Sequence, residues 1–262
     1  MNNLIHDTQS QRIEVLDNRY YTNDEKTFYP GSTTILDVYP KGAWFVKWLK
    51  EQGEDADKIR DAAGDQGSNV HNATEAIDKG QEVVWADPET GKPFFTLAEW
   101  QMILNYVDFL DKVKPKILAV EAVMCSDYLG FGGTLDRIVE FGGKRWLLDI
   151  KTSNQMADTY VMQTASYSKL WNEKHQNCLV DSHCILWLKA NIKTDKIDEK
   201  KETWQGRPHA NTRGWQIVTF DETIEDAFKD FQHVQAIWNR ANPNFKPLNL
   251  VYPDRIKVTK TA

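Results

Sequence analysis

The chain has 262 residues, of which 41% are hydrophobic and 27% charged, a composition that fits a globular protein and excludes disordered, collagen-like and coiled-coil classes. The formal net charge of −6 argues against a protein that coats nucleic acid through bulk positive charge, although a local basic path to a polyanion remains compatible with it. No apolar run approaches the roughly 18 to 20 residues of a membrane span, and the first residues lack a secretion or transit signal, so we expect a cytoplasmic protein.

The N-terminal part of the chain reads as a hairpin followed by helices. The run RIEVLDNRYYT predicts a strand pair hinged at Asp17 and Asn18, and Pro30 with Gly31 predicts a turn. Short helices are expected over 33–50 and 54–63, and a longer one from near residue 68 to the glycine at 80. A loop at 88–93 precedes a helix over 97–113, which the apolar spacing predicts.

The second half of the chain begins with strands. The runs ILAVEAVMCS, GGTLDRIVEF and RWLLDIKTS are rich in β-branched and aliphatic residues and are separated by glycine-containing turns, which indicates three consecutive strands. A helix over 158–174, a strand at HCILWLKA, a strand over 215–220 and a last helix over 222–240 follow. The polar segment 191–213 is expected to be a mobile hairpin or loop.

This order of elements predicts an α/β fold, with a mixed central β-sheet flanked by helices and an N-terminal helical elaboration. We expect one domain over 1–262. Its parts are an N-terminal hairpin and helices at 1–63, a core with the functional motifs at 64–190, the loop at 191–213, a closing strand and helix at 214–241, and a tail at 242–262.

The three cysteines predict neither a disulfide framework nor a zinc ribbon. They are odd in number and lack CxxC spacing, so we expect buried free thiols at Cys125, Cys178 and Cys184.

The hairpin GGTLDRIVEFGGKRWLLDIKTS carries the candidate chemistry. If Gly142 and Gly143 form a two-residue turn, Phe141 faces Lys144 and the register is fixed. Counting back, Asp136 faces Asp149, with their Cβ atoms about 4.5–5.5 Å apart, and Lys151 shares a face with Asp149. Two carboxylates and an ammonium are therefore predicted to converge.

Facing carboxylates in an apolar hairpin repel each other unless a cation neutralises them. Magnesium or manganese would do so and would support phosphodiester hydrolysis, with Lys151 orienting or deprotonating the attacking water and offsetting charge on phosphorus. Asp136, Asp149 and Lys151 are the expected catalytic residues. The alternative is that Asp149 and Lys151 only pair at a strand end while Asp136 is partly exposed.

Four motifs in this order resemble the PD-(D/E)XK phosphodiesterase superfamily, in particular its RecB-like exonuclease branch, which includes many phage exonucleases. They are QGSNVHNATE, GGTLD, LLDIKTS and QTASY, and YPGSTTIL also resembles the lead-in of these phage proteins. The resemblance implies a restriction-endonuclease-like core. It also implies metal ligation by His71, Asp136, Asp149 and the backbone carbonyl of Ile150, with supporting or DNA-contacting roles for Glu75, Glu121, Gln163 and Tyr167.

Purely structural roles for these residues are the alternatives. His71 could be a hydrogen-bonded structural residue, Glu75 could cap or pack its own helix, and Tyr167 could belong to the core of an amphipathic helix with Gln163 beside it. Two features depart from the family. Gln66 stands where the family often has arginine, and three cysteines cannot supply the four thiolates of an iron–sulfur cluster, so none is expected.

The resemblance implies a metal-dependent DNA exonuclease that acts at DNA ends or in single strands, with no membrane association. A phage origin and partner proteins of replication or recombination are expected, whereas the oligomeric state is left open. No helicase P-loop is present in the sequence. The alternatives are a structure-specific endonuclease, a catalytically inactive DNA-binding accessory protein and an α/β protein with no nucleic-acid role.

Overall fold

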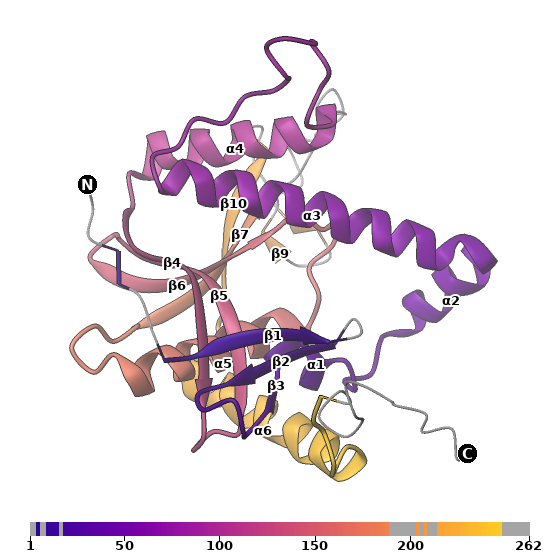
Figure 1. Ribbon diagram of the computed structural model, residues 1–262, viewed down its shortest axis with the longest axis vertical. Coiled ribbons are helices and arrows are strands. Elements are labelled where there is room, and N and C mark those ends of the chain that lie inside the picture. The colour runs from indigo at the N-terminus through magenta and orange to yellow at the C-terminus, as the bar shows by residue number, and fades with distance from the viewer. Residues whose placement is uncertain are drawn as a thin grey trace, which may run out of the picture.

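The computed structural model describes residues 4–5, 9–15, 18–188, 203–204, 207–208 and 214–247. Its centre is a mixed five-stranded sheet in the order β10, β7, β6, β5, β4 (Figure 1). These strands are β4 Lys116–Ser126, β5 Phe131–Phe141, β6 Lys144–Lys151, β7 Ser182–Leu188 and β10 Trp215–Thr219. The β6–β7 pair is parallel and the other three pairs are antiparallel. The predicted α/β fold with a mixed sheet is confirmed.

Helices cover both faces of this sheet. α3 (Ala56–Asp78) and α4 (Leu97–Val113) lie on one face, and α5 (Thr159–Lys174) and α6 (Ile224–Ala241) lie on the other (Figure 1). Because successive strand residues point to opposite faces, neighbouring leucines of β6 enter different cores. Leu147 packs in the core that contains α5 and α6, whereas Leu148 packs in the core that contains α3 and α4.

The β5–β6 turn has the predicted geometry. Gly142 and Gly143 adopt φ values of 59° and 74°, which a two-residue hairpin turn requires of both positions. Phe141 pairs with Lys144, and the register continues without a shift to Arg137 opposite Leu148. The predicted register is therefore confirmed as far as this pair, and Asp136 and Asp149 are the next residues beyond it on the two strands.

The N-terminal part of the chain forms a second sheet, which has three strands. It consists of β1 (Gln11–Val15), β2 (Asn18–Thr22) and β3 (Tyr29–Pro30), and β1 pairs antiparallel with β2 as predicted. Of the expected hinge, Asn18 is the first residue of β2 and Asp17 lies outside the described residues.

Two helix predictions in this region are wrong. The helix expected over 33–50 is split into α1 (Ser32–Leu36) and α2 (Ala43–Gln52), because proline at 40 has no amide hydrogen and disfavours a helical residue before it. The separate helix expected over 54–63 is the start of α3, which follows a 3-10 turn at Gly53–Asp55.

α3 continues through Gly64 and Gly67, although glycine lowers helix stability by about 1 kcal/mol relative to alanine. At Gly67 the helix approaches the end of β6 closely. A Cβ atom there would lie 3.3 Å from the Thr152 hydroxyl oxygen, so tertiary packing explains why the glycine is tolerated.

Two glycines in β5 permit close packing of aromatic rings. A Cβ atom on Gly132 would lie 2.4 Å from Tyr21 Cβ, and one on Gly133 would lie 2.4 Å from Tyr167 Cε1. Neither position tolerates a side chain at these distances. β2 and α5 therefore both contact the central sheet at the strand that carries Asp136.

The remaining predictions are mostly confirmed. The helix over 97–113 and the loop over 88–93 are as expected, α3 stops before Gly80, and the helices expected over 158–174 and 222–240 are α5 and α6. Of the segment 191–213, the structure describes a short antiparallel pair, β8 (Thr203–Trp204) and β9 (Arg207–Pro208), and the rest lies outside the described residues, as does 248–262 of the tail.

The cysteine prediction holds for two of three positions. The three cysteines are thiols that form no disulfide, and Cys125 and Cys184 are buried while Cys178 is partly exposed. Within the described residues, no helix is long and apolar enough to cross a membrane.

Candidate active site

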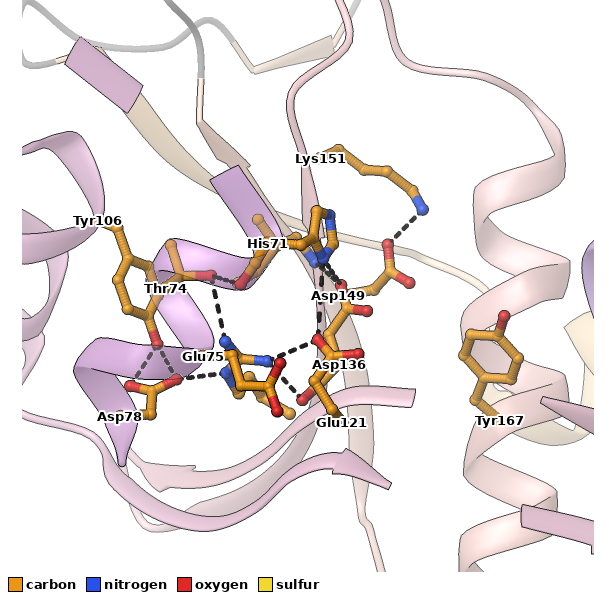
Figure 2. Close-up of polar contacts among 12 residues, drawn as sticks. His71, Thr74, Glu75, Asp78, Tyr106, Glu121, Asp136, Asp149, Lys151 and Tyr167 are labelled. Carbon is orange, nitrogen blue, oxygen red and sulfur yellow. Dashed lines mark hydrogen bonds and ion pairs between the residues drawn. The ribbon is translucent and has the colours of Figure 1, made fainter. Parts of the chain in front are cut away.

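The two aspartates of the hairpin are both buried, with 8% of Asp136 and 1% of Asp149 exposed. Asp136 Oδ2 accepts a hydrogen bond from the backbone amide of Ile150 over 2.6 Å. The first carboxylate is therefore tied to the strand that carries the second, and both belong to one polar cluster between α3 and α5 (Figure 2).

His71 and Glu121 join Asp136 from two other elements, α3 and β4. Each of the three residues offers one ligand atom, and these atoms all lie within 4.8 Å of one another. His71 Nδ1 is 3.6 Å from Asp136 Oδ2 and 3.9 Å from Glu121 Oε1. An imidazole and two carboxylates at this spacing form a suitable ligand set for a divalent cation.

Glu121 reaches this group through an unusual backbone. Its φ is 47°, a left-handed conformation that residues other than glycine rarely adopt and that is out of place in a strand. It lies between two regular pairs of the β4–β5 ladder, Val120 with Arg137 and Ala122 with Leu135. Such strain costs roughly 1–3 kcal/mol and clusters at functional sites, which supports a functional role for this carboxylate.

Lys151 pairs with Asp149, as predicted from their shared face. Its ammonium nitrogen lies 2.6 Å from Asp149 Oδ2 and 4.7 Å from the centroid of the Tyr160 ring. Burial lowers the pKa of Lys151, but Asp149 and Asp136 raise it and the net shift is upward. The ammonium therefore stays protonated at neutral pH.

The pKa shifts of Asp149 and His71 reflect the carboxylates gathered around them. Burial raises the pKa of Asp149 to about 6, with Lys151 opposing the shift and Asp136 adding to it. Burial lowers the pKa of His71, but Asp136 and Glu121 outweigh it and the net shift is upward. A metal ion that bound the imidazole would have to displace this favoured proton.

Gln163 and Tyr167 lie on α5, behind the second aspartate. Gln163 Nε2 donates to Asp149 Oδ1 over 3.3 Å and lies 3.4 Å from the Tyr167 hydroxyl. Tyr167 is also part of the buried core, as the packing alternative expects, and its supporting role stays a prediction. Glu75, by contrast, forms an ion pair with Lys79 on its own helix and is outside the group of three ligands.

Sequence reasoning missed a second polar cluster, centred on the fully buried Arg137. The guanidinium donates to Asp78, to Glu121 Oε1 over 3.0 Å and to Thr74 Oγ1 over 3.2 Å. Tyr106 donates to both oxygens of Asp78, each over 2.7 Å (Figure 2). We call Thr74, Asp78 and Tyr106 the inner cluster, and His71, Glu121, Asp136, Asp149 and Lys151 the outer cluster.

Two signals in the sequence could have revealed the inner cluster. Arg137 occupies the strand face that also carries Val139, a core residue, and a charge at a core position needs a buried partner. Asp78 lies seven residues after His71, so both occupy one face of α3. Arg137 touches both clusters, because it also donates to the backbone carbonyl of Asp136 over 2.8 Å.

The outer cluster fits a divalent cation on one further observation. Asp149 Oδ2 is buried and, among the described residues, accepts no hydrogen bond of normal geometry, although the Lys151 ammonium is close to it. A carboxylate oxygen has two lone pairs, so with only the Lys151 ammonium beside it this oxygen has capacity left for a metal ion. Three carboxylates face one ammonium and one shared guanidinium, so the donor set and its charge both suit a divalent metal ion.

Comparison with known proteins gives one family match. The PD-(D/E)XK nuclease superfamily matches residues 40–248, a range that includes every residue of both clusters. An alkaline exonuclease from Laribacter hongkongensis is 10% identical over 82% of this chain and 94% of its own, at a TM-score of 0.35. A protein designated SSO0001 is 13% identical over 61% of this chain and 72% of its own, at a TM-score of 0.27. No curated protein matches the sequence.

Proposed function

Because the chain belongs to the PD-(D/E)XK nuclease superfamily, we propose that it is a metal-dependent DNA exonuclease that hydrolyses phosphodiester bonds at DNA ends or in single strands. The observation that supports this most is the outer cluster itself. A ligand set of His71, Glu121 and Asp136 lies beside an Asp149–Lys151 ion pair, and these residues come from α3, β4, β5 and β6.

We assign the cation site to His71, Asp136, Asp149 and the Ile150 carbonyl, with Glu121 as a further ligand or a support for one. Magnesium and manganese suit this mainly oxygen-donor set. When bound, such an ion neutralises the carboxylates and the scissile phosphate and makes a water molecule easier to deprotonate.

Lys151 is assigned the role of a charged donor. With its ammonium beside Asp149, Lys151 is placed to orient the attacking water and to stabilise negative charge on the phosphate in the transition state. Its 2.6 Å contact with Asp149 holds the side chain in place before the substrate binds.

The remaining residues position this machinery. Gln163 holds one oxygen of Asp149, and Tyr167 lies behind Gln163. Arg137 holds Glu121 and the backbone of Asp136 from the buried side. These contacts fix carboxylate orientation, which is what a metal ion with a demanding coordination geometry needs.

The exonuclease part of the proposal depends on the resemblance of the motifs to the RecB-like branch. The same resemblance supports a phage-encoded enzyme of replication, recombination or host-DNA breakdown. A structure-specific endonuclease and an inactive DNA-binding protein are outcomes of the test below.

The test is cleavage of DNA labelled at the 5′ or 3′ end, linear or circular, with magnesium, manganese or EDTA. We expect linear DNA to lose nucleotides from an end only with metal, while circular single strands survive. Cleavage of circles would make the protein an endonuclease. Binding without cleavage under every metal condition would identify a DNA-binding protein and reject the catalytic proposal.

A further inference from the structure

A cavity of about 680 Å³ opens beside the outer cluster on the side of α5. Its lining includes Lys151 and Gln163, so whatever occupies it lies next to Asp149, which both residues contact. Its size falls within the roughly 300–1,000 Å³ typical of sites for small organic groups. The cation ligands do not use this space.

The cavity has two walls that carry apolar side chains, and the acidic residues Asp37 and Asp158 also line it. One wall comes from the connection between α1 and α2 and the start of α2, and contributes Tyr39, Pro40 and Phe45. The other comes from the segment between β6 and α5 and the first turn of α5, and contributes Met156 and Tyr160. Aromatic and sulfur-containing side chains offer the kind of surface on which a planar ring stacks.

A second lysine also lines this cavity. Lys41 Nζ lies 5.4 Å from the centroid of the Phe45 ring and 3.5 Å from Asp37 Oδ1. Lys41 and Lys151 therefore both line a space with aromatic walls, and each is paired with a carboxylate, Lys41 with Asp37 and Lys151 with Asp149. This combination of cations and rings suits a ligand that carries both a phosphate and a planar base. It suits such a ligand better than an apolar peptide segment.

We propose that this cavity binds one unpaired nucleotide of the DNA strand that is being cleaved, with its base against Phe45 and its phosphates toward Lys41 and Lys151. The proposal rests on the proposed function, because it takes the outer cluster as the place of cleavage. It deepens that function by assigning the substrate class to strands with an unpaired end.

The requirement for an unpaired base follows from geometry. A base within a duplex is stacked on both faces and paired at its edge, so it enters a lateral cavity only by leaving the stack. An unpaired base has free faces, and stacking on an aromatic side chain is tolerant of sequence. The ammonium of Lys41 over Phe45 would move from the ring to the phosphate of the bound nucleotide, exchanging one cation contact for a stronger one.

The experiment compares Phe45→Leu, which removes the ring and keeps apolar bulk, with Phe45→Tyr, which keeps the ring. Binding of a fluorescent single-stranded oligonucleotide is measured in EDTA, where no cleavage is expected, and KM and kcat are measured with metal. We expect Phe45→Leu to raise Kd and KM by roughly five- to a hundredfold, the range for loss of one base–aromatic stack, and Phe45→Tyr to resemble the wild type. Tyr128→Leu is the matched control, because Tyr128 is 89% exposed on the β4–β5 turn, away from the cavity.

A second arm uses oligonucleotides with one abasic position moved along the strand. An abasic site at one position of the strand should weaken wild-type binding about as much as Phe45→Leu does. Combining that abasic site with Phe45→Leu should weaken binding no further, because the base and the ring are the two halves of one contact. Blunt duplex DNA should bind Phe45→Leu and the wild type equally.

The proposal would be overturned if Phe45→Leu bound single strands as tightly as the wild type, or if it lost equal affinity for blunt duplex DNA. It would also be overturned if the abasic position weakened binding as much in Phe45→Leu as in the wild type. Melting temperatures of all variants show whether they are folded. If no DNA is cleaved but binding depends on Phe45 and the abasic position as described, the nucleotide site stands and the catalytic proposal fails. If DNA is cleaved and Phe45→Leu behaves as the wild type, the catalytic proposal stands and the nucleotide site is rejected.

Discussion

On the buried side of the Arg137 guanidinium, Asp78 accepts hydrogen bonds from two elements, from Tyr106 on α4 and Arg137 on β5, and its side chain is 1% exposed. On the other side, Glu121, Asp136 and Asp149 gather around an imidazole and one ammonium, and Asp149 retains a buried oxygen that accepts no hydrogen bond of normal geometry among the described residues. The inner cluster is complete within the protein. The outer cluster is short of positive charge. Substitutions in the inner cluster should therefore change stability, whereas substitutions in the outer cluster should change chemistry.

The largest effect is expected from the outer carboxylates. Asp149→Asn and Asp136→Asn should each lower the cleavage rate by at least roughly a thousandfold, because each removes a charged metal ligand. The melting temperature without metal should hold or rise slightly at pH 7. Burial already raises the pKa of Asp149 to about 6 in the folded protein, so a neutral group replaces an unfavourable charge there.

Both properties are measured on one preparation of each variant. Cleavage at the wild-type rate by either variant would remove the hairpin from the catalytic centre.

Arg137→Met should produce the largest loss of stability. It leaves Asp78 buried without its cation, and breaking a buried pair in this way destabilises a protein by about 3–5 kcal/mol. Adding Asp78→Asn should recover much of this loss, because the amide still accepts from Tyr106 and carries no charge.

Urea unfolding of the single and double variants measures the difference. If Arg137→Met were as stable as the wild type, the inner cluster would not support the fold as we describe it.

Lys151→Ala should separate turnover from metal binding. Loss of the ammonium removes stabilisation of charge on the phosphate, which corresponds to roughly a hundredfold or more in rate. Manganese affinity should be unchanged or higher, because Asp149 loses a competing cation. Calorimetric titration and a cleavage assay test the two quantities, with Lys79→Ala as the control, since Lys79 pairs with Glu75 on the surface of α3. Joint loss of affinity and activity would show that Lys151 has a structural role.

The smallest effect is expected at His71, a neutral ligand among charged ones. His71→Ala should weaken manganese binding by at least about tenfold, and high manganese should restore part of the activity because the carboxylates remain. His233→Ala, at a side chain that is 82% exposed, is the control. Unchanged affinity with a lowered melting temperature would instead identify His71 as a packing residue.

The hairpin was predictable because its signals are local. Two adjacent glycines fix the turn, and a period of two then determines which residues face each other, so Asp136 and Asp149 could be placed from the sequence alone. The length of α3 was not predictable in this way. Gly64 and Gly67 favour a break; the close approach to Thr152 gives a packing reason for glycine at 67, whereas nothing lies within 4 Å of a Cβ atom at 64.

The contacts of Arg137 and the backbone of Glu121 depend on long-range packing. Arg137 meets Asp78 across 59 positions of sequence, and no local pattern specifies that pairing. Glutamate has no preference for the left-handed φ of Glu121, so no local pattern predicts this conformation. For the same reason, no pattern in the sequence indicates that the connection between α1 and α2 forms a wall beside Lys151.

The paired glycines of β5 also predict how related sequences can vary. Since a methyl group at 132 would overlap Tyr21 and one at 133 would overlap the ring of Tyr167, each glycine and its tyrosine form a linked pair of positions. A relative with alanine at 133 is expected to carry a smaller residue at 167, and one with a larger residue at 132 should have glycine at 21, because the overlap includes Tyr21 Cβ itself. These two couplings should appear as covariation in an alignment of the family, in positions that the chemistry of the metal ligands does not constrain directly.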